Sequence, residues 1–277
     1  MDKVVIVGGF EYLGFSLATS FLEEGYYVDC IDIELLLEPI YEEKRFSVGR
    51  NANFQEIKIK DWVSLEQKHV EDSLIVISFY DIYLMKDHES MKMKKEIYDA
   101  LLRLNINNNQ FLFLLPIHFL VDLGTEIEDF TALCSELKRR NNSIKQVYIP
   151  TLYGPWQPNE YLFQQALLHV FDGERNLKLN KREYLHDAIY IEDVIREIKQ
   201  IIEDNSKETS VLKSELSDHW KKCAEFLMIN PEVYQVTSEQ ARIQPSIGSI
   251  IVKESIGLEK GLAKQKEYAK RYIKEFL

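Results

Sequence analysis

The chain has little of what stabilises small secreted domains or membrane proteins. Its 277 residues include only three cysteines, Cys30, Cys134 and Cys223, and these lie far apart. An odd number at wide spacing indicates neither a disulfide framework nor a zinc knuckle, and a reducing cytoplasm is the expected compartment. The most apolar run, Phe111 to Val121, is shorter than the roughly 20 residues that a membrane-spanning helix needs. We therefore expect it to be a buried strand and expect no contact with a membrane.

Positive charge is also scarce. The formal net charge is -11 and the sequence pI is near 5.2, which excludes a footprint for nucleic acid. The six histidines never pair at a spacing of four, and only His219 has a cysteine, Cys223, at that spacing. A metal centre is not indicated. There is no G-x-S-x-G turn for a serine hydrolase, and the opening Met1-Asp2-Lys3 leads directly into an expected strand, so we expect no signal peptide.

What the chain does contain is an alternation of short apolar runs and longer amphipathic stretches. This alternation is typical of parallel strands joined by helices. The predicted strands are Val4 to Val7, Tyr27 to Ile31, Phe54 to Ile57, Leu74 to Ser78, Gln110 to Leu115 and Ser143 to Ile149. The predicted helices are Phe15 to Glu24, Glu89 to Leu104, Glu126 to Arg140, Tyr190 to Glu203 and Leu258 to Phe276, and Asp204 to Thr209 is expected to be a polar surface loop.

The segment Val4 to Gly14, VVIVGGFEYLG, is the most informative part of the chain. It is a buried-strand run that ends in a glycine-marked turn before a helix. In a G-x-x-G-x-x-G turn, the glycines let the backbone approach a pyrophosphate, and the helix N-terminus favours its negative charge. Gly8 and Gly14 are present, but Glu11 stands at the middle glycine. The sequence therefore predicts a dinucleotide-type turn with a carboxylate where the anion would lie.

Five motifs along the chain resemble one family. The opening VVIVGGFEYLG resembles V-x-V-T-G-G-x-G-F-I-G, and Gly25 to Asp32 resembles G-x-x-V-x-x-x-D. The segment Ile149 to Pro155 is similar to the motif L-R-P-x-N-V-Y-G-P. The segment Asp187 to Val194 is similar to R-D-F-I-Y-V-D-D-V. The segment Leu258 to Leu262 is similar to L-x-x-G-L. Together these motifs resemble the extended short-chain dehydrogenase/reductases, the NAD-dependent epimerase/dehydratase group that acts on nucleotide sugars.

The resemblance implies a Rossmann-type α/β fold, a doubly wound parallel sheet followed by a smaller C-terminal α/β domain of substrate type. We expect the dinucleotide-type domain over residues 1–154, with 187–204 also belonging to it, and the smaller domain over 155–277. The family's dimers pack two helices of each subunit into a bundle. Glu89 to Leu104 and Glu126 to Arg140 occupy those places, which predicts a homodimer or a heterodimer with an intact paralogue.

The family's catalytic pair is a Y-x-x-x-K helix, in which the tyrosine carries a proton and the lysine lowers its pKa. Here Phe130 stands in the tyrosine position and Cys134 in the lysine position. Phenylalanine has no titratable proton, and a neutral thiol supplies no positive charge. None of the fifteen tyrosines has a lysine four residues on. His118, after the fifth strand, is either a backbone-bonded histidine or a substitute acid.

The resemblance implies NAD(P) as cofactor and assigns its contacts to the turn and to the ends of two strands. Asp32, after the second strand, is where the family's ribose-binding carboxylate sits, whereas Lys58 stands where an adenine-contacting aspartate is found. The charge of Glu11 opposes a bound pyrophosphate. Alternatively, Glu11 itself satisfies the helix N-terminus. The candidate cofactor-binding residues are Gly8, Gly9, Phe10, Glu11, Tyr12, Leu13, Gly14, Asp32 and Pro150.

The candidate substrate-binding residues are Thr151, Tyr153 and His186. Thr151 replaces the family's asparagine, and His186 replaces an arginine that clamps a nucleotide diphosphate. A neutral histidine cannot make the two-pronged contact of an arginine. Lys181 and Arg182 could compensate, or they form an exposed basic turn. The aromatic residues Trp156, Tyr161 and Phe163 could stack on a base or belong to the core, and the pair Glu192 and Asp193 is expected to be a solvated helix start.

Two hypotheses about function remain from the sequence. In the first, the chain is a non-catalytic relative of the nucleotide-sugar epimerases and dehydratases that serves as a binding, regulatory or partner subunit. In the second, it is an active NAD(P)-dependent epimerase, dehydratase or reductase in which His118 carries the proton. Both allow a nucleotide or a nucleotide sugar as the small-molecule partner.

Overall fold

The computed structural model describes residues 2–32, 39–64, 73–84, 87–103, 109–120, 125–140, 142–172, 176–204, 207–234 and 248–276. It divides into two compact units. Unit 1 comprises residues 1–147 and 202–209, and unit 2 comprises residues 148–201 and 210–277. The division lies at residue 147, and the boundary was expected at residue 154. The segment 187–204 was expected in the first domain, whereas 187–201 lies in unit 2 and 202–209 lies in unit 1.

Unit 1 is built on parallel strands in the order β6-β5-β4-β1-β2-β3, part of a main sheet of eight strands. Their bounds are β1 Lys3–Val7, β2 Tyr27–Asp32, β3 Phe54–Lys58, β4 Leu74–Ser78, β5 Gln110–Pro116 and β6 Ser143–Ile149. All six agree with the predicted strands to within one residue at each end. The four central strands are almost entirely buried, which explains their continuous apolar runs.

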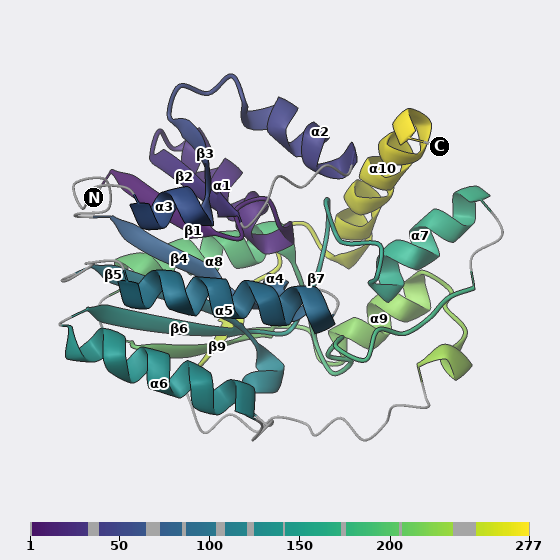
Figure 1. The fold of residues 1–277 in the computed structure, drawn as a ribbon. Helices are drawn as coiled ribbons and strands as arrows, with labels where there is room; N and C mark the ends of the chain where they lie inside the picture. Colours follow the sequence, from purple (N-terminus) through teal and green to yellow (C-terminus); the bar gives the residue numbers. More distant parts are fainter. Residues whose placement is uncertain are drawn as a thin grey trace. The chain divides into compact units, whose positions relative to one another are not determined.

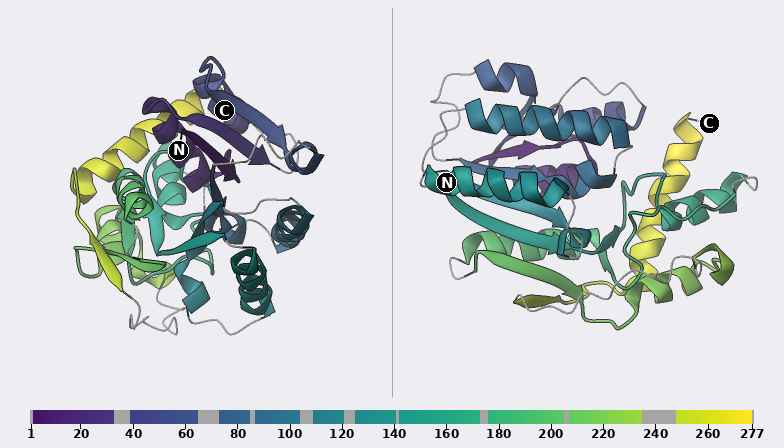
Figure 2. Two further views of the ribbon diagram at one scale, coloured as in Figure 1. Left: turned by 90° about the vertical axis from the view of Figure 1, so that its left-hand side faces the viewer. Right: turned by 60° about the horizontal axis from the view of Figure 1, so that its bottom comes forward.

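The helices of unit 1 follow the strands in alternation (Figure 1). They are α1 Tyr12–Glu23, α2 Pro39–Val48, α3 Ile59–Ser64, α4 Phe79–Leu84, α5 Asp87–Arg103 and α6 Thr125–Arg139, with the 3-10 helix η2 Ile117–Leu120. The predicted end of α5 at Leu104 lies outside the described residues. Both views of the sheet show α3, α5 and α6 side by side over one of its faces (Figures 1 and 2), whereas α1 packs on β1, β2 and β4.

Unit 2 contributes β9 Thr209–Ser214 and β10 Ser249–Val252 to the main sheet and also holds a separate parallel pair, β7 Thr151–Tyr153 with β8 Ala188–Tyr190. None of these four strands was predicted: β7 and β8 are only three residues long, Tyr190 was expected in a helix and Thr209 in a loop, and no element was predicted over the rest of β9 or over β10. The helices are α7 Leu162–Asp172, α8 Ile191–Glu203, α9 His219–Phe226 and α10 Leu258–Phe276, with η3 Pro231–Val233.

Two predicted boundaries of this region were wrong. The helix expected from Tyr190 starts at Ile191, because Tyr190 belongs to β8, and the polar loop expected over Asp204 to Thr209 ends in the first residue of β9. The final helix agrees with its prediction at both ends. The α/β class with a mostly parallel sheet flanked by helices is confirmed. Among the described residues, no helix is both long and apolar enough to cross a membrane.

Candidate functional site: the turn between β1 and α1

The glycine turn is formed as the sequence predicts. Gly8 has a φ of +82°, which favours glycine, and its N–H donates to the Ile31 carbonyl at 2.9 Å. A Cβ on Gly9 would lie 2.5 Å from the side chain of Cys30, and one on Gly14 would lie 2.0 Å from the Gly8 carbonyl oxygen. Gly8 is therefore favoured by its positive φ, and Gly9 and Gly14 are required by their close contacts with Cys30 and with the Gly8 carbonyl, with or without a ligand.

The free amides at the start of α1 are bound by a side chain that the sequence analysis did not single out. Asp81, in the first turn of α4, accepts from the Leu13 N–H at 3.0 Å through Oδ1 and from the Gly14 N–H at 2.9 Å through Oδ2. The Ser78 hydroxyl donates to the same Oδ2 at 2.8 Å. The Asp81 carboxylate is 4% exposed. A protein carboxylate thus takes the place at the helix N-terminus that suits an anion.

Burial raises the pKa of Asp81, while the hydrogen bonds from Leu13, Gly14 and Ser78 and the charge of Lys44 act in the opposite direction. A sequence signal for this arrangement exists. Ser78 and Asp81 form an S-x-x-D pair at the start of a helix, and directly after a buried strand. The signal predicts only a cap on α4 itself, whereas the contact with α1 depends on β4 lying beside β1 in the sheet.

Glu11 does not cap the helix, so the interpretation that it satisfies the N-terminus was wrong. Its backbone is extended, with ψ at -172°, and its side chain makes no hydrogen bond with the first turn. Instead, the Tyr41 hydroxyl donates to its carboxylate at 3.3 Å. Burial raises the pKa of Glu11 to about 8; Lys44 opposes this rise, whereas Asp32 and Asp81 add to it.

A lysine from α2 completes the cluster, and the sequence analysis did not name it. The Lys44 ammonium, buried beneath the turn, donates to the Phe10 carbonyl at 2.6 Å and to the Glu11 carbonyl at 3.3 Å. It also lies 5.3 Å from the ring centres of Phe15 and of Tyr41. Burial lowers the pKa of Lys44, and Glu11 opposes this shift. Lys44 therefore holds the turn from the side of α2.

Asp32 lies at the end of β2, as predicted, and is 5% exposed. Its carboxylate oxygens make no hydrogen bond of standard geometry with the described residues, although the Phe10 backbone lies near enough to lower the pKa of Asp32. Burial, together with the charge of Glu56, raises the pKa of Asp32 to about 7. Lys58 pairs with Asp32 in the register of β2 and β3 but has an exposed side chain. A buried carboxylate without a donor of standard geometry is the one feature of this turn that suits a ligand hydroxyl.

The two residues that the resemblance assigns to the family's catalytic pair lie on α6 in unit 1. Phe130 is 5% exposed, and its ring packs against Phe79 and Phe113, with centroids 5.5 and 5.3 Å away. Cys134 is buried, its Sγ lies 3.6 Å from the amide nitrogen of Gln146, and burial raises its pKa to about 12. His118, the suggested substitute, is in η2, where its ring stacks on Tyr83 at 5.5 Å. Its catalytic role remains a prediction.

The predicted substrate contacts lie in unit 2 and are largely used within the protein. The Thr151 hydroxyl donates to the Tyr184 carbonyl at 3.0 Å and accepts from the Tyr184 N–H at 2.9 Å. The Tyr153 ring is buried, with its hydroxyl 3.3 Å from His219 Nε2. His186 packs on the edge of Tyr184, and Pro150 is buried between β6 and β7. Their binding roles remain predictions.

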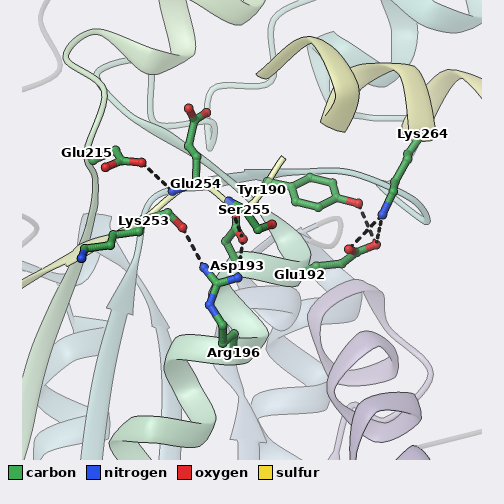
Figure 3. Close-up of polar contacts among 9 residues, drawn as sticks. All are labelled: Tyr190, Glu192, Asp193, Arg196, Glu215, Lys253, Glu254, Ser255 and Lys264. Atoms are coloured by element: carbon green, nitrogen blue, oxygen red, sulfur yellow. Dashed lines mark hydrogen bonds and ion pairs between the residues drawn. The ribbon is translucent and has the colours of Figure 1, made fainter. Parts of the chain in front are cut away.

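The motif at β8 and α8 serves the packing of unit 2 (Figure 3). Tyr190 donates to Glu192 at 2.7 Å, and the Lys264 ammonium of α10 contacts the same carboxylate at 3.0 Å. Asp193 accepts from the Ser255 N–H at 3.2 Å. The expectation of a solvated Glu192 and Asp193 pair was wrong for Asp193, which is buried. The two acids tie α10 and the segment after β10 to the start of α8.

Other candidate residues of unit 2 have ordinary structural surroundings. Tyr161 and Phe163 belong to the core, and the Trp156 ring packs at a tilt against Tyr268 with ring centres 4.3 Å apart. His219 and Cys223 are both buried on α9. Within the described ranges no group of three His, Cys, Asp or Glu side chains could hold a metal ion.

Neither a protein-family model nor a curated protein matches the sequence. Solved structures match over the whole chain. UDP-glucuronic acid 4-epimerase from Bacillus cereus, in complex with UDP-glucuronic acid and NAD, is 14% identical, with a TM-score of 0.67 and coverage of 98% of this chain and 99% of that chain.

The chain has the fold of the NAD-dependent nucleotide-sugar epimerases and dehydratases of the extended short-chain dehydrogenase/reductase type. The dTDP-glucose 4,6-dehydratase of Bacillus anthracis, in complex with NAD, is 12% identical with a TM-score of 0.66, covering 98% of this chain and 97% of that chain. WbmH of Bordetella bronchiseptica, in complex with NAD+, is 13% identical with a TM-score of 0.61, covering 98% and 99%. At these identities the likeness concerns the fold.

These similar structures hold NAD, and the turn of this chain can be tested for its fit to that cofactor. Asp32 suits a ribose hydroxyl, because its two buried oxygens make no hydrogen bond of standard geometry with the described residues. The phosphate end does not fit, since Asp81 already binds the Leu13 and Gly14 amides and the Glu11 side chain lies in the same buried cluster. A pyrophosphate placed there would meet carboxylates and no free helix amide at these two positions.

Proposed function

We propose that the chain is a non-catalytic relative of the nucleotide-sugar epimerases and dehydratases that serves as a binding, regulatory or partner subunit. The observation that carries the proposal is Phe130, which stands where the family resemblance expects the proton-carrying tyrosine. Its ring is enclosed by the rings of α4, β5 and η2, including Phe119 at 6.2 Å. A hydrocarbon side chain in an aromatic cluster has no proton to transfer.

The other half of the catalytic pair supports the same conclusion. Cys134 stays neutral at physiological pH, because burial raises its pKa to about 12. It cannot supply the positive charge that would lower the pKa of a neighbouring acid. The loss of a positioned acid/base group reduces a rate by about 10²- to 10⁴-fold. With neither group on α6, the expected turnover by this mechanism is negligible.

The scaffold outside α6 supports a role that uses the fold without the reaction. The glycine turn, the ordered strands and the tie between α8 and α10 are all retained. A homodimer, or a heterodimer with an intact paralogue in the cytoplasm, remains our prediction for its assembly, and a nucleotide sugar remains the predicted small-molecule ligand.

A turnover assay tests the proposal. Purified protein is incubated with NAD+ and either UDP-glucuronic acid or dTDP-glucose, and epimerised or dehydrated product is followed by chromatography and mass spectrometry. We expect no product above the protein-free control, and the His118→Ala variant should be indistinguishable from the wild type. Turnover by the wild type that disappears in His118→Ala would contradict the proposal and favour the active alternative.

A further inference from the structure

We propose that Asp81 is a built-in anion that occupies the phosphate end of α1, so that the chain completes its dinucleotide turn without a dinucleotide. The inference goes beyond the proposed function, because that function rests on α6 and this inference rests on the turn. It assigns a role to a residue that no motif of the family singles out.

The first step concerns the donors at the start of α1. A helix N-terminus leaves backbone N–H groups without partners inside the helix, and anions bind to them. Here the Leu13 and Gly14 amides each have a hydrogen bond of 3.0 Å or less to a different oxygen of Asp81. The carboxylate therefore bridges two amides in the way that a phosphate group would.

The second step concerns how Asp81 reaches α1. β4 is the parallel neighbour of β1, with Ile77 opposite Val7, so the residues after both strands emerge at the same edge. α4 begins directly after β4, and its first turn contacts α1. The Ser78 hydroxyl donates to Asp81 and so fixes the orientation of the carboxylate. The position of the Asp81 side chain is therefore set by the pairing of β4 with β1 in the sheet.

The third step concerns what a competing phosphate would meet. Displacing Asp81 would leave a buried carboxylate without the Leu13, Gly14 and Ser78 donors that now bind it, which is unfavourable for a buried polar group. The phosphate would also lie near Glu11, which belongs to the same electrostatic cluster. The Lys44 ammonium already donates to the Phe10 and Glu11 carbonyls. The turn therefore disfavours a dinucleotide because Asp81 already occupies the two amides.

Side chains from two helices hold the turn in place in the ligand-free protein. Asp81 holds the turn from the side of α4, while Tyr41 and Lys44 hold it from the side of α2. Contacts from both neighbouring helices provide the constraint that a bound cofactor gives to an ordinary dinucleotide turn. The structure thus assigns to Asp81 the positioning of α1 in the absence of any ligand.

Amide hydrogen exchange, followed by NMR on the full chain without added nucleotide, tests this role. We expect the Leu13 and Gly14 amides to be protected in the wild type and to exchange at least tenfold faster in Asp81→Asn. The matched control is Asp129→Asn, on the exposed surface of α6, which should leave both amides unchanged. Millimolar NAD should change neither the wild-type exchange rates nor its melting temperature.

A gain of binding provides the second readout. The double variant Glu11→Gly with Asp81→Gly removes both carboxylates from the turn, and we expect it to bind NAD at least tenfold more tightly than the wild type. Three results would overturn the proposal: free exchange at Leu13 and Gly14 in the wild type, a wild-type melting temperature that rises with NAD, or a folded double variant with no gain in affinity. Turnover is not part of this test, so its outcome is independent of the proposed function.

Discussion

Replacing Glu11 by glutamine is expected to remove a large part of the chain's loss of stability with rising pH. Burial raises the pKa of Glu11 from 4.5 to about 8 in the folded chain. Between these two values the folded chain holds a proton at Glu11 that the unfolded chain has already lost. The free energy of unfolding therefore falls as the pH rises through this window.

The magnitude follows from the size of the shift. One pKa unit corresponds to about 1.4 kcal/mol, and the interval from pH 5 to pH 8 spans most of the shift, so we expect a loss on the order of 3 kcal/mol between about pH 5 and about pH 8. Glutamine resembles the protonated form and keeps an acceptor for the Tyr41 hydroxyl. The variant should match the wild type near pH 5 and exceed its stability near pH 8.

Urea unfolding followed by far-UV circular dichroism measures this difference across the pH range. The pKa values of Glu183 and Asp187 are raised in the same direction, but these two groups lie outside the Glu11 cluster, are present in both proteins and cancel in the comparison. Glu42→Gln, at an exposed site of α2, is the matched control and should follow the wild type. Parallel curves for Glu11→Gln and the wild type, or a deficit of the variant that grows with pH, would refute the reasoning.

Three further predictions concern other buried groups. Asp32→Asn should raise the melting temperature at about pH 8 more than at about pH 5, because it removes a buried charge with a raised pKa; equal effects at both values would contradict this. Phe130→Ala should lower the free energy of unfolding in urea by about 3–5 kcal/mol, because it leaves a cavity in the aromatic cluster. A loss below about 1 kcal/mol would show that the ring is not packed there. Gln265→Leu should lower the free energy of unfolding by about 1–3 kcal/mol, because the Gly154 N–H and the Gln157 side chain lose their hydrogen-bond partner. Calorimetry that finds no loss of stability would refute the role of this network.

The positions of the core strands along the chain and the glycine turn could be predicted from the sequence because both depend on local patterns. Buried parallel strands appear as continuous apolar runs, and Gly8 and Gly14 mark a turn whose backbone tolerates little else. The final helix was predicted at both ends because Gly257 precedes it and its apolar spacing is regular. Short strands such as β7 and β8 were missed, since three residues carry no measurable period.

The chemistry of the turn could not be predicted, because it depends on contacts between distant segments. Asp81 is 67 residues from Gly14, and only the neighbouring positions of β1 and β4 bring them together. Lys44 reaches Phe10 from α2, 34 residues away. The sequence showed that a carboxylate would be near the helix N-terminus but named the wrong one. The Glu11 carboxylate accepts a hydrogen bond from Tyr41, whereas Asp81, in the helix that follows the neighbouring strand, accepts from the Leu13 and Gly14 amides.

We propose that the chain keeps the fold and that its own Asp81 carboxylate fills the phosphate site. A crystal structure of the protein grown in saturating NAD tests this most directly. We predict the Asp81 carboxylate on the Leu13 and Gly14 amides, with no dinucleotide at the turn. A fully occupied NAD whose pyrophosphate binds those two amides, with Asp81 displaced, would contradict the account.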